Sequence, residues 1–306
     1  MRLFRNCSSD FKKNLPSYVL LLPAFLYTVI FGYLTYPYMA IAFENYDYEK
    51  GIFSDFVGLR NFEAFFKSTQ AWQVTRNTLL LNFLFIFIGT LAAVLLAILL
   101  NEIRCRIFLK FSQSVILFPY FISWVIVSFI LYALLSTDTG MINNMLAALG
   151  LPRVNFYSSP GMWPGILTVL KIWKEIGYKA IIFLAAITGI DEGLFEAASI
   201  DGAGRWKQIK KILIPLLLPT VSILILFDIG RIFFGDFTMM YSLVGDNGML
   251  LPTTDIIDTF VFRALRLSGN ASIAMAVGFY QSVVGSLIVY TVNKLTKKFY
   301  PEGALF

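Results

Sequence analysis

The chain has 306 residues, of which 58% are hydrophobic and only 14% are charged. Soluble domains carry about 25% charged residues, so the composition excludes a water-soluble globule and indicates a polytopic membrane protein. The formal net charge of +6 comes from short basic segments between apolar runs, a pattern that orients membrane proteins and does not indicate nucleic-acid binding. Histidine is absent, which removes the usual general base and the commonest metal ligand. We therefore expect no catalytic site and no metal site.

Six apolar runs are long enough to cross a membrane, which takes about 20 residues. They cover residues 17–43, 76–100, 114–135, 162–187, 215–235 and 271–293. Backbone polar groups in lipid must bond within their own segment, and the runs show no two-residue alternation, so helices are predicted rather than a barrel. The first run is about twice as long as the apolar core of a signal peptide, which predicts a retained span. The predicted fold class is all-α, with six transmembrane helices in one domain.

Basic residues mark one side of the membrane. They lie in the amino-terminal segment and at 104–110, 205–211 and 294–298, whereas the loop at 44–67 is rich in acids. The basic side is cytoplasmic by the positive-inside rule, so both termini are expected inside. The predicted organisation is a cytoplasmic tail at 1–16, a membrane domain at 17–293 and a cytoplasmic tail at 294–306. In the outer loop, Phe62, Phe65 and Phe66 at helical spacing predict a short helix on the membrane surface.

Charged residues interrupt the fourth and fifth runs, and charges inside spans indicate function by default. Lys171, Lys174, Glu175 and Tyr178 share one helix face, where a Lys171–Glu175 or a Lys174–Tyr178 pair is expected to shield part of the charge. Asp228 and Arg231 are neighbours that can also pair. Aromatic faces and polar hydroxyl-binding groups suit a sugar. The alternative is that these charges pair across helices to fix the bundle, or contact a second permease. We interpret the group as a translocation pathway formed by Trp173, Lys174, Glu175, Tyr178, Asp228 and Arg231.

A charged, glycine-containing segment at 188–214 separates the fourth and fifth runs on the cytoplasmic side. Residues 191–200 favour a helix that places Leu194, Phe195 and Ala198 on one face. Asp201-Gly202 then breaks the helix, and a second helix from Arg205 is expected to place Trp206, Ile209 and Leu213 on one stripe. The prediction is a helix–turn–helix whose apolar ridge fits a groove on a partner. The alternative is an amphipathic loop that only caps the bundle.

The same segment carries a family resemblance. Glu196-Ala197-Ala198, followed by Gly202, Ile212 and Pro215, resembles the "EAA…G…I-LP" signature of permease subunits of ATP-binding cassette importers. Asp201-Gly202-Ala203, Trp206 and Pro219 resemble its fuller form in the carbohydrate-uptake branch, although Ile214 stands where leucine is usual. "LPAFLYTVIFGYLTYPY" and "VGLRNFEAFF" are similar to the first span and first outer loop of this family. The resemblance is greatest to LplB-like polysaccharide permeases.

This resemblance implies that 188–214 is a coupling loop that docks on an ATP-hydrolysing subunit. The implied contact residues are Leu194, Phe195, Glu196, Ala197, Ala198, Asp201, Gly202, Ala203, Trp206 and Pro215. It also implies a bacterial cytoplasmic membrane with its lipid, a second homologous permease in a heterodimer, two copies of the ATPase and an extracytoplasmic solute-binding protein. The solute is expected to be an oligosaccharide or polysaccharide fragment. The lysines of the fourth run hint at acidic sugars, an indication that Glu175 offsets.

The chain has no G-x-x-x-x-G-K-[ST] phosphate loop, so ATP and Mg²⁺ are expected on the partner ATPase, with no cofactor and no enzymatic activity in this chain. Two alternatives stay open. One is the same architecture importing a non-sugar solute such as a glycerophosphodiester or a peptide. The other is a stand-alone secondary transporter, which typically shows more spans and internal symmetry.

Overall fold

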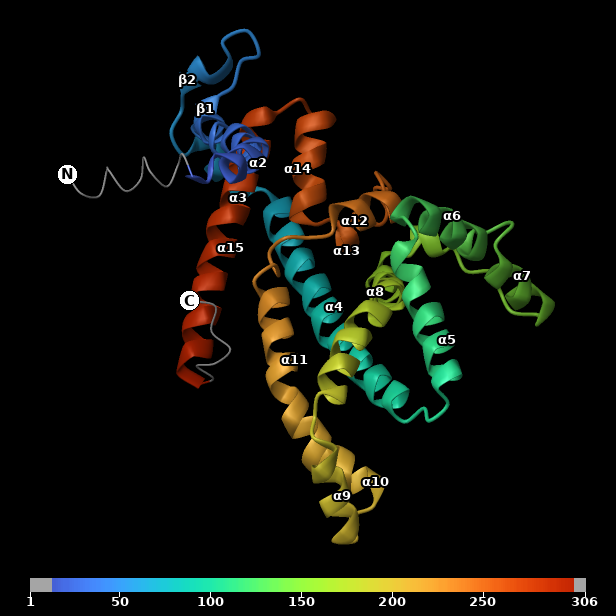
Figure 1. Cartoon of the computed structure of the whole chain (residues 1–306). Coiled ribbons are helices and arrows are strands. Elements are labelled where there is room, and N and C mark those ends of the chain that lie inside the picture. The colour runs from blue at the N-terminus through green and yellow to red at the C-terminus, as the bar shows by residue number, and fades with distance from the viewer. Residues whose placement is uncertain (1–12, 300–306) are drawn as a thin grey trace.

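The computed structural model describes residues 13–299. The predicted tails at 1–16 and 294–306 therefore lie largely outside the described residues, which begin and end within them. Helices dominate the chain (Figure 1). Two short strands, β1 (Glu44–Asn45) and β2 (Asp55–Phe56), form an antiparallel pair in the first outer loop, with Glu44 opposite Phe56. Apart from these two strands, the predominantly helical structure of residues 13–299 agrees with the all-α prediction.

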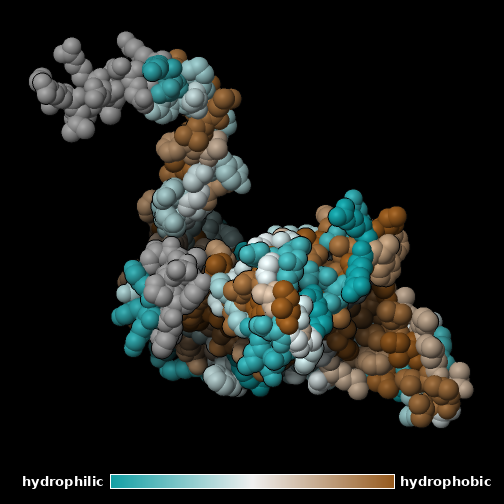
Figure 2. Space-filling model, turned by 60° about the horizontal axis from the view of Figure 1, so that its bottom comes forward, coloured by the Kyte–Doolittle hydropathy of each residue, from teal (hydrophilic) through white to brown (hydrophobic). Residues whose placement is uncertain are grey.

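The N-terminal apolar segment forms an arm. It consists of α2 (Leu15–Tyr27), a π-helical turn (Thr28–Tyr33) and a 3-10 helix (Tyr36–Phe43). No residue of α2 or of the π-helical turn is buried. Figure 2 shows this arm standing away from the rest of the molecule, with apolar side chains on its surface. A helix that is apolar on all sides needs lipid or another protein around it.

Long helices form the body of the molecule. They are α4 (Thr69–Asn101), α8 (Trp163–Thr188), α11 (Ile214–Ile229) and α15 (Ala271–Phe299), of which α4, α11 and α15 run alongside one another in Figure 1. Ser68 begins α4 by accepting a hydrogen bond from the Ala71 amide, 3.3 Å away. Alanines and leucines of α4 pack on Phe183 and Leu184 of α8 in a core that Leu213 and Leu217 extend.

Within residues 13–299, four helical segments are long and apolar enough to cross a membrane. They are Leu15–Phe43, Thr69–Asn101, Arg205–Ile229 and Ala271–Lys298. A fifth is obtained if the bent pair of helices described next counts as one span. The 26-residue helix α8 is also long enough, but four charged residues interrupt its apolar sequence. The expected run at 162–187 is thus a helix of the predicted length, whereas the total of six spans is not reached by length and composition alone.

The prediction of one uninterrupted helix over 114–135 is wrong. The chain instead forms α5 (Arg106–Leu117), a 3-10 turn (Phe118–Phe121) and α6 (Trp124–Leu135), with a bend of 95° between the two helices. Pro119 supplies no backbone N–H, which favours a break. Ser123 then begins α6 by accepting a hydrogen bond from the Ile126 amide at 3.3 Å. We call this bend, residues 118–123, the elbow; α7 (Met141–Ala148) follows α6.

Short helices cover the end of the bundle opposite α9 and α10 in Figure 1. The predicted helix in the first outer loop is α3 (Arg60–Lys67), and its Phe65 is only 2% exposed against Phe260 and Tyr280. Protein contacts therefore hold the buried side of α3, and its location on the membrane surface stays a prediction. The layer also contains α12 (Phe237–Leu243), α13 (Leu251–Thr254) and α14 (Ile257–Arg266).

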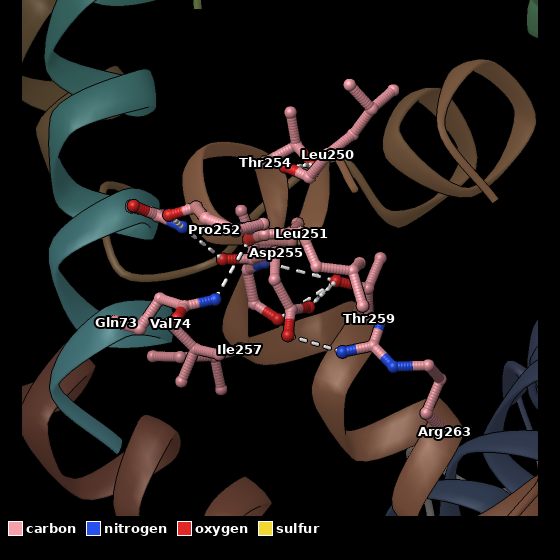
Figure 3. Close-up of polar contacts among 12 residues, drawn as sticks. Gln73, Val74, Leu250, Leu251, Pro252, Thr254, Asp255, Ile257, Thr259 and Arg263 are labelled. Carbon is pink, nitrogen blue, oxygen red and sulfur yellow. Dashed lines mark hydrogen bonds and ion pairs between the residues drawn. The ribbon is translucent and has the colours of Figure 1, made fainter. Parts of the chain in front are cut away.

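Polar contacts fasten α13 and α14 to α4 (Figure 3). The Gln73 side-chain amide donates to the Leu251 carbonyl at 2.9 Å, and the Ile257 amide donates to Thr78 Oγ1 at 3.0 Å. Asp255 is buried, accepts a hydrogen bond from Thr259 and forms an ion pair with Arg263. A buried carboxylate needs such partners because desolvation alone disfavours its charge. These contacts fix the outer layer relative to the long helices.

Candidate translocation cavity and coupling hairpin

A cavity of about 480 Å³ lies where α4, α8, the end of α11 and the start of α12 meet. Six charged side chains line it: Lys171, Glu175, Lys179, Asp228, Arg231 and Asp236. Phe85, Phe234 and Phe237 add aromatic rings to the same wall. A cavity of this size is within the range of about 300–1,000 Å³ that small-molecule sites occupy, and it combines rings with polar groups.

Ion pairs connect the helices across the cavity. Lys171 Nζ lies 2.6 Å from Glu175 Oε1 on the same helix and 2.8 Å from Asp236 Oδ2. Lys179 Nζ lies 2.5 Å from Asp228 Oδ2 and so joins α8 to α11. The suggested Lys171–Glu175 pair is confirmed. The alternative Lys174–Tyr178 pair is not formed within residues 13–299, because Lys174 Nζ donates to backbone carbonyls instead. Asp228 pairs with Lys179 rather than with Arg231, which is exposed toward the cavity.

The connection between α11 and α12 is shaped by close contacts. The Asn82 side-chain amide donates to the carbonyls of Ile232 and Phe234, at 2.8 and 3.1 Å. Asp236 accepts a hydrogen bond from the Met239 amide and thereby caps α12. A side chain at Gly235 would place its Cβ 2.2 Å from Ile256 Cδ1, so the Ile256 side chain would have to shift to admit it. These contacts hold Asp236 where Lys171 reaches it.

The predicted pathway residues separate into two groups. Glu175, Asp228 and Arg231 line the cavity. Lys174 instead lies at the elbow, where its Nζ donates to the carbonyls of Tyr120 and Ile122 at 2.7 and 2.5 Å. Tyr178 and Trp173 do not line the cavity either. The Tyr178 ring stacks on Tyr120, with 5.0 Å between the ring centroids, and Trp173 is partly exposed.

Two charged residues of the cavity, Lys179 and Asp236, were not identified from the sequence. Lys179 follows Lys171 and Glu175 at four-residue intervals on one face of α8, and this spacing was a usable signal. The sequence signal for Asp236 was weaker: it is an acidic residue that directly follows a glycine and precedes a helix. Its place in the cavity depends on the fold of the α11–α12 connection, which the local sequence does not reveal.

Asp258, in the outer-layer helix α14, supports the cavity from behind. Its Oδ2 accepts hydrogen bonds from the Gly235 amide at 2.8 Å and from Gln281 Nε2 at 3.0 Å. Burial raises the pKa of the Asp258 carboxyl above its ordinary value, and the nearby Asp236 carboxylate adds to that rise, against the lowering effect of the two hydrogen bonds.

Replacing Asp258 by asparagine should make the protein more stable at neutral pH. Because the folded-state pKa is raised, the ionised carboxylate destabilises the fold once the pH exceeds the ordinary value of 3.8. An asparagine oxygen still accepts both hydrogen bonds and carries no charge. Thermal unfolding of wild type and Asp258→Asn between pH 4 and pH 7.5 should show a difference that grows with pH. A wild type that is the more stable of the two at pH 7.5 would contradict this.

The segment predicted as a helix–turn–helix forms a compact hairpin. It consists of α9 (Glu192–Ile200), a turn at 201–204, and α10 (Arg205–Gln208), which continues through a π-helical turn (Ile209–Leu213) into α11. Gly202 has a φ of +75°, a conformation that favours glycine. We call residues 191–208 the coupling hairpin. The predicted helix–turn–helix is therefore confirmed, although its second helix does not end before the next long helix.

Buried and exposed side chains divide the hairpin into two sides. Buried Gln208 donates to Ser199 Oγ at 2.8 Å and to the Ala203 carbonyl at 3.1 Å, and Arg205 pairs with Glu102 at 2.7 Å. The sequence predicted that Trp206, Ile209 and Leu213 share one apolar face. Ile209 and Leu213 are indeed buried, but Trp206 is 77% exposed. Exposed positions also include Leu194, Glu196, Ala197, Ile200, Asp201, Gly202 and Pro215, and Phe195, Ala198 and Ala203 are half-buried.

Residues 8–298 match the family described as binding-protein-dependent transport system inner membrane component. The chain belongs to this family. Among curated relatives, the polygalacturonan/rhamnogalacturonan transport system permease protein YteP of Bacillus subtilis (strain 168) is 36% identical over 94% of this chain and 89% of its own length. Protein LplB of the same organism is 35% identical over 94% of this chain and 90% of its own length.

A solved structure resembles this inner membrane component over nearly its whole length. It is a chain of a bacterial alginate ABC transporter in complex with alginate pentasaccharide-bound periplasmic protein, with 33% identity, a TM-score of 0.85, and coverage of 95% of this chain and 97% of that one. The resemblance to importer permeases of the LplB-like branch is thus confirmed. The prediction of a membrane protein with several apolar helices is confirmed as well.

Proposed function

We propose that this chain is the permease subunit of an ATP-driven importer that takes up carbohydrate as oligosaccharides or polysaccharide fragments. The observation that carries the proposal is the connection between hairpin and cavity. The first helix of the coupling hairpin follows α8, which bears Lys171, Glu175 and Lys179, and the second continues into α11, which bears Asp228. A partner that moves the hairpin therefore moves both helices that carry the cavity ion pairs. The names of the relatives, a polygalacturonan/rhamnogalacturonan transport system permease and an alginate ABC transporter, support carbohydrate as the solute.

Alternating access follows from this connection. The Lys179–Asp228 pair joins α8 to α11, so the two helices move together as one rigid body, and this movement switches access to the cavity. Gln208 and the Glu102–Arg205 pair keep the hairpin rigid, so that a displacement at its exposed ridge of Leu194, Ile200 and Trp206 reaches the long helices. This chain contains no phosphate loop, so a partner ATPase binds ATP and Mg²⁺ and supplies the force.

The partners of this assembly are a second, homologous permease, two copies of the ATPase and an extracytoplasmic solute-binding protein. The apolar arm of α2, which has no buried residue, supports a permease heterodimer within membrane lipid. The proposed topology has six spans, in which α8 and the α5–α6 pair join the four apolar segments. Basic residues on the hairpin and directly after it, Arg205, Lys207, Lys210 and Lys211, support a cytoplasmic location of the hairpin and of both termini in a bacterial cell.

The coupling role is tested by two matched glycines of the hairpin. A Cβ at Gly202 or at Gly204 meets no atom within 4 Å, but only Gly202 has a positive φ. Gly202→Val should therefore distort the turn, because a β-branched residue resists that backbone region, and should reduce substrate-stimulated ATP hydrolysis several-fold. Gly204→Val should leave it near wild type. The measurement uses the complex of both permeases, ATPase and binding protein in lipid vesicles.

Two outcomes would contradict the proposal. The first is full transport by this chain in vesicles without any ATPase, which would make it a stand-alone transporter. The second is equal substrate-stimulated ATP hydrolysis in Gly202→Val, Gly204→Val and wild type, which would remove the coupling role from the hairpin turn.

A further inference from the structure

Arg231 differs from the other cations of the cavity. Lys171 is held by two carboxylates and Lys179 by one. Among the residues that the structure describes, no carboxylate lies within ion-pair distance of the Arg231 guanidinium, and no side-chain hydrogen bond engages it. The residue follows the end of α11, and its side chain is exposed toward the cavity. The cavity therefore contains a cation whose donors are free for a ligand.

The chemistry of the guanidinium group indicates which class of ligand Arg231 would bind. Its five N–H donors form a rigid planar fork that matches the two oxygens of a carboxylate, and it keeps its charge at any physiological pH. A neutral saccharide needs only neutral donors and acceptors, which the cavity supplies elsewhere through Asn82, Thr238 and the backbone. Phe234 and Phe237, which lie near Arg231 in the chain and line the same cavity, offer faces on which a sugar ring packs.

The distribution of charge in the cavity also favours an anionic ligand at Arg231. The Lys171 group has one cation and two carboxylates and so repels an anion, and the Lys179–Asp228 pair is neutral. An entering carboxylate is therefore directed to Arg231 and away from the α8 lysines, which are already neutralised. The lysines of α8, which first suggested an acidic substrate, are thus not the groups that would bind it.

We propose that Arg231 binds the carboxylate of an acidic sugar unit and so selects uronate-containing oligosaccharides over neutral ones. This inference rests on the proposed function, because it assigns a substrate class and a specificity-determining residue to the same cavity. The ring of the sugar unit packs on Phe234 or Phe237, and its carboxylate accepts two hydrogen bonds from the guanidinium.

The test compares an acidic oligosaccharide with its uncharged methyl ester. Vesicles that contain the complete complex are supplied with an oligogalacturonate or with its methyl ester, and uptake of each is measured. Wild type should prefer the acid. Arg231→Gln should lower uptake of the acid by at least about tenfold, the scale of one lost hydrogen bond to a charged group, with little effect on the ester. Arg231→Lys should restore part of the preference, because it keeps the charge without the fork.

A matched control is Arg266→Gln, which removes an exposed arginine of α14 that does not line the cavity. It should leave the preference for the acid unchanged. If Arg231→Gln transports the acid as well as wild type, or loses acid and ester equally, the role of Arg231 is overturned while carbohydrate import stands. If wild type takes up neither saccharide, the failure lies in the carbohydrate assignment itself, and the inference falls with it.

Discussion

Replacement of Lys174 by methionine is expected to destabilise the permease by about 3 kcal/mol or more and to loosen the angle between α5 and α6. Lys174 Nζ donates to the carbonyls of Pro119, Tyr120 and Ile122, at 3.4, 2.7 and 2.5 Å. These carbonyls belong to the elbow, where the helical hydrogen bonds of α5 have ended. The ammonium also lies over the rings of Tyr120 and Trp124, 5.7 and 5.4 Å from their centroids.

Two opposing terms decide the sign of this prediction. Burial of the ammonium costs free energy, which methionine avoids while it keeps similar length. Against this, methionine leaves the carbonyls of Tyr120 and Ile122 without a donor, at about 1–3 kcal/mol each, and removes two cation–π contacts, whereas the Pro119 carbonyl still accepts from the Ile122 amide. The second term is larger because Lys174 is only 9% exposed, so water does not replace the lost donor readily. The net effect is therefore destabilising.

Thermal unfolding of the purified protein measures the loss of stability for Lys174→Met. Spin labels at the exposed positions Phe108 on α5 and Phe129 on α6 report the elbow through the distance between them, which should broaden. Lys110→Met is the control, because Lys110 is an exposed residue of α5 that lies outside the elbow. Wild-type stability and an unchanged label distance in Lys174→Met would show that the elbow does not depend on this lysine.

The long helices were predictable because apolar length alone defines them. The run expected at 76–100 is part of α4, Thr69–Asn101, and the run at 162–187 is α8, Trp163–Thr188. The elbow was not predicted, because apolar residues continue across it and hydropathy does not respond to a break. Pro119 and Ser123 were the only local signals. The lysine that stabilises the break lies 52 to 55 residues away in the chain, beyond the reach of any local pattern.

The candidate sites show the same dependence on sequence separation. The Lys171–Glu175 pair was predictable since both residues lie one turn apart on a single helix. The hairpin was predictable because its helices and turn are local. By contrast, the Lys179–Asp228 pair spans 49 residues and the Arg205–Glu102 contact spans 103. Consequently the sequence indicated candidate residues, whereas only the fold shows which of them pair and that Arg231 has no ion-pair partner among residues 13–299.

The approach of α8 to α5 depends on Gly177. A Cβ at this position would lie 2.2 Å from the carbonyl oxygen of Ile116 and 2.7 Å from its carbonyl carbon. The neighbour is backbone, which cannot rotate away as a flexible side chain can. Gly177 also lies one turn beyond Lys174 on α8, so the contact and the elbow depend on the same spacing between the two helices.

Gly177→Ala is therefore expected to push α8 from α5 and to cost about 3 kcal/mol or more, at or above the upper end of the usual range for overpacking. Gly165→Ala on the same helix is the matched control, because its Cβ would meet no atom within 4 Å and alanine favours a helix by about 0.5–1 kcal/mol. Thermal unfolding of the two variants should thus move in opposite directions, with reduced recovery of folded Gly177→Ala. Equal unfolding temperatures would mean that α8 and α5 are not held this closely in the membrane.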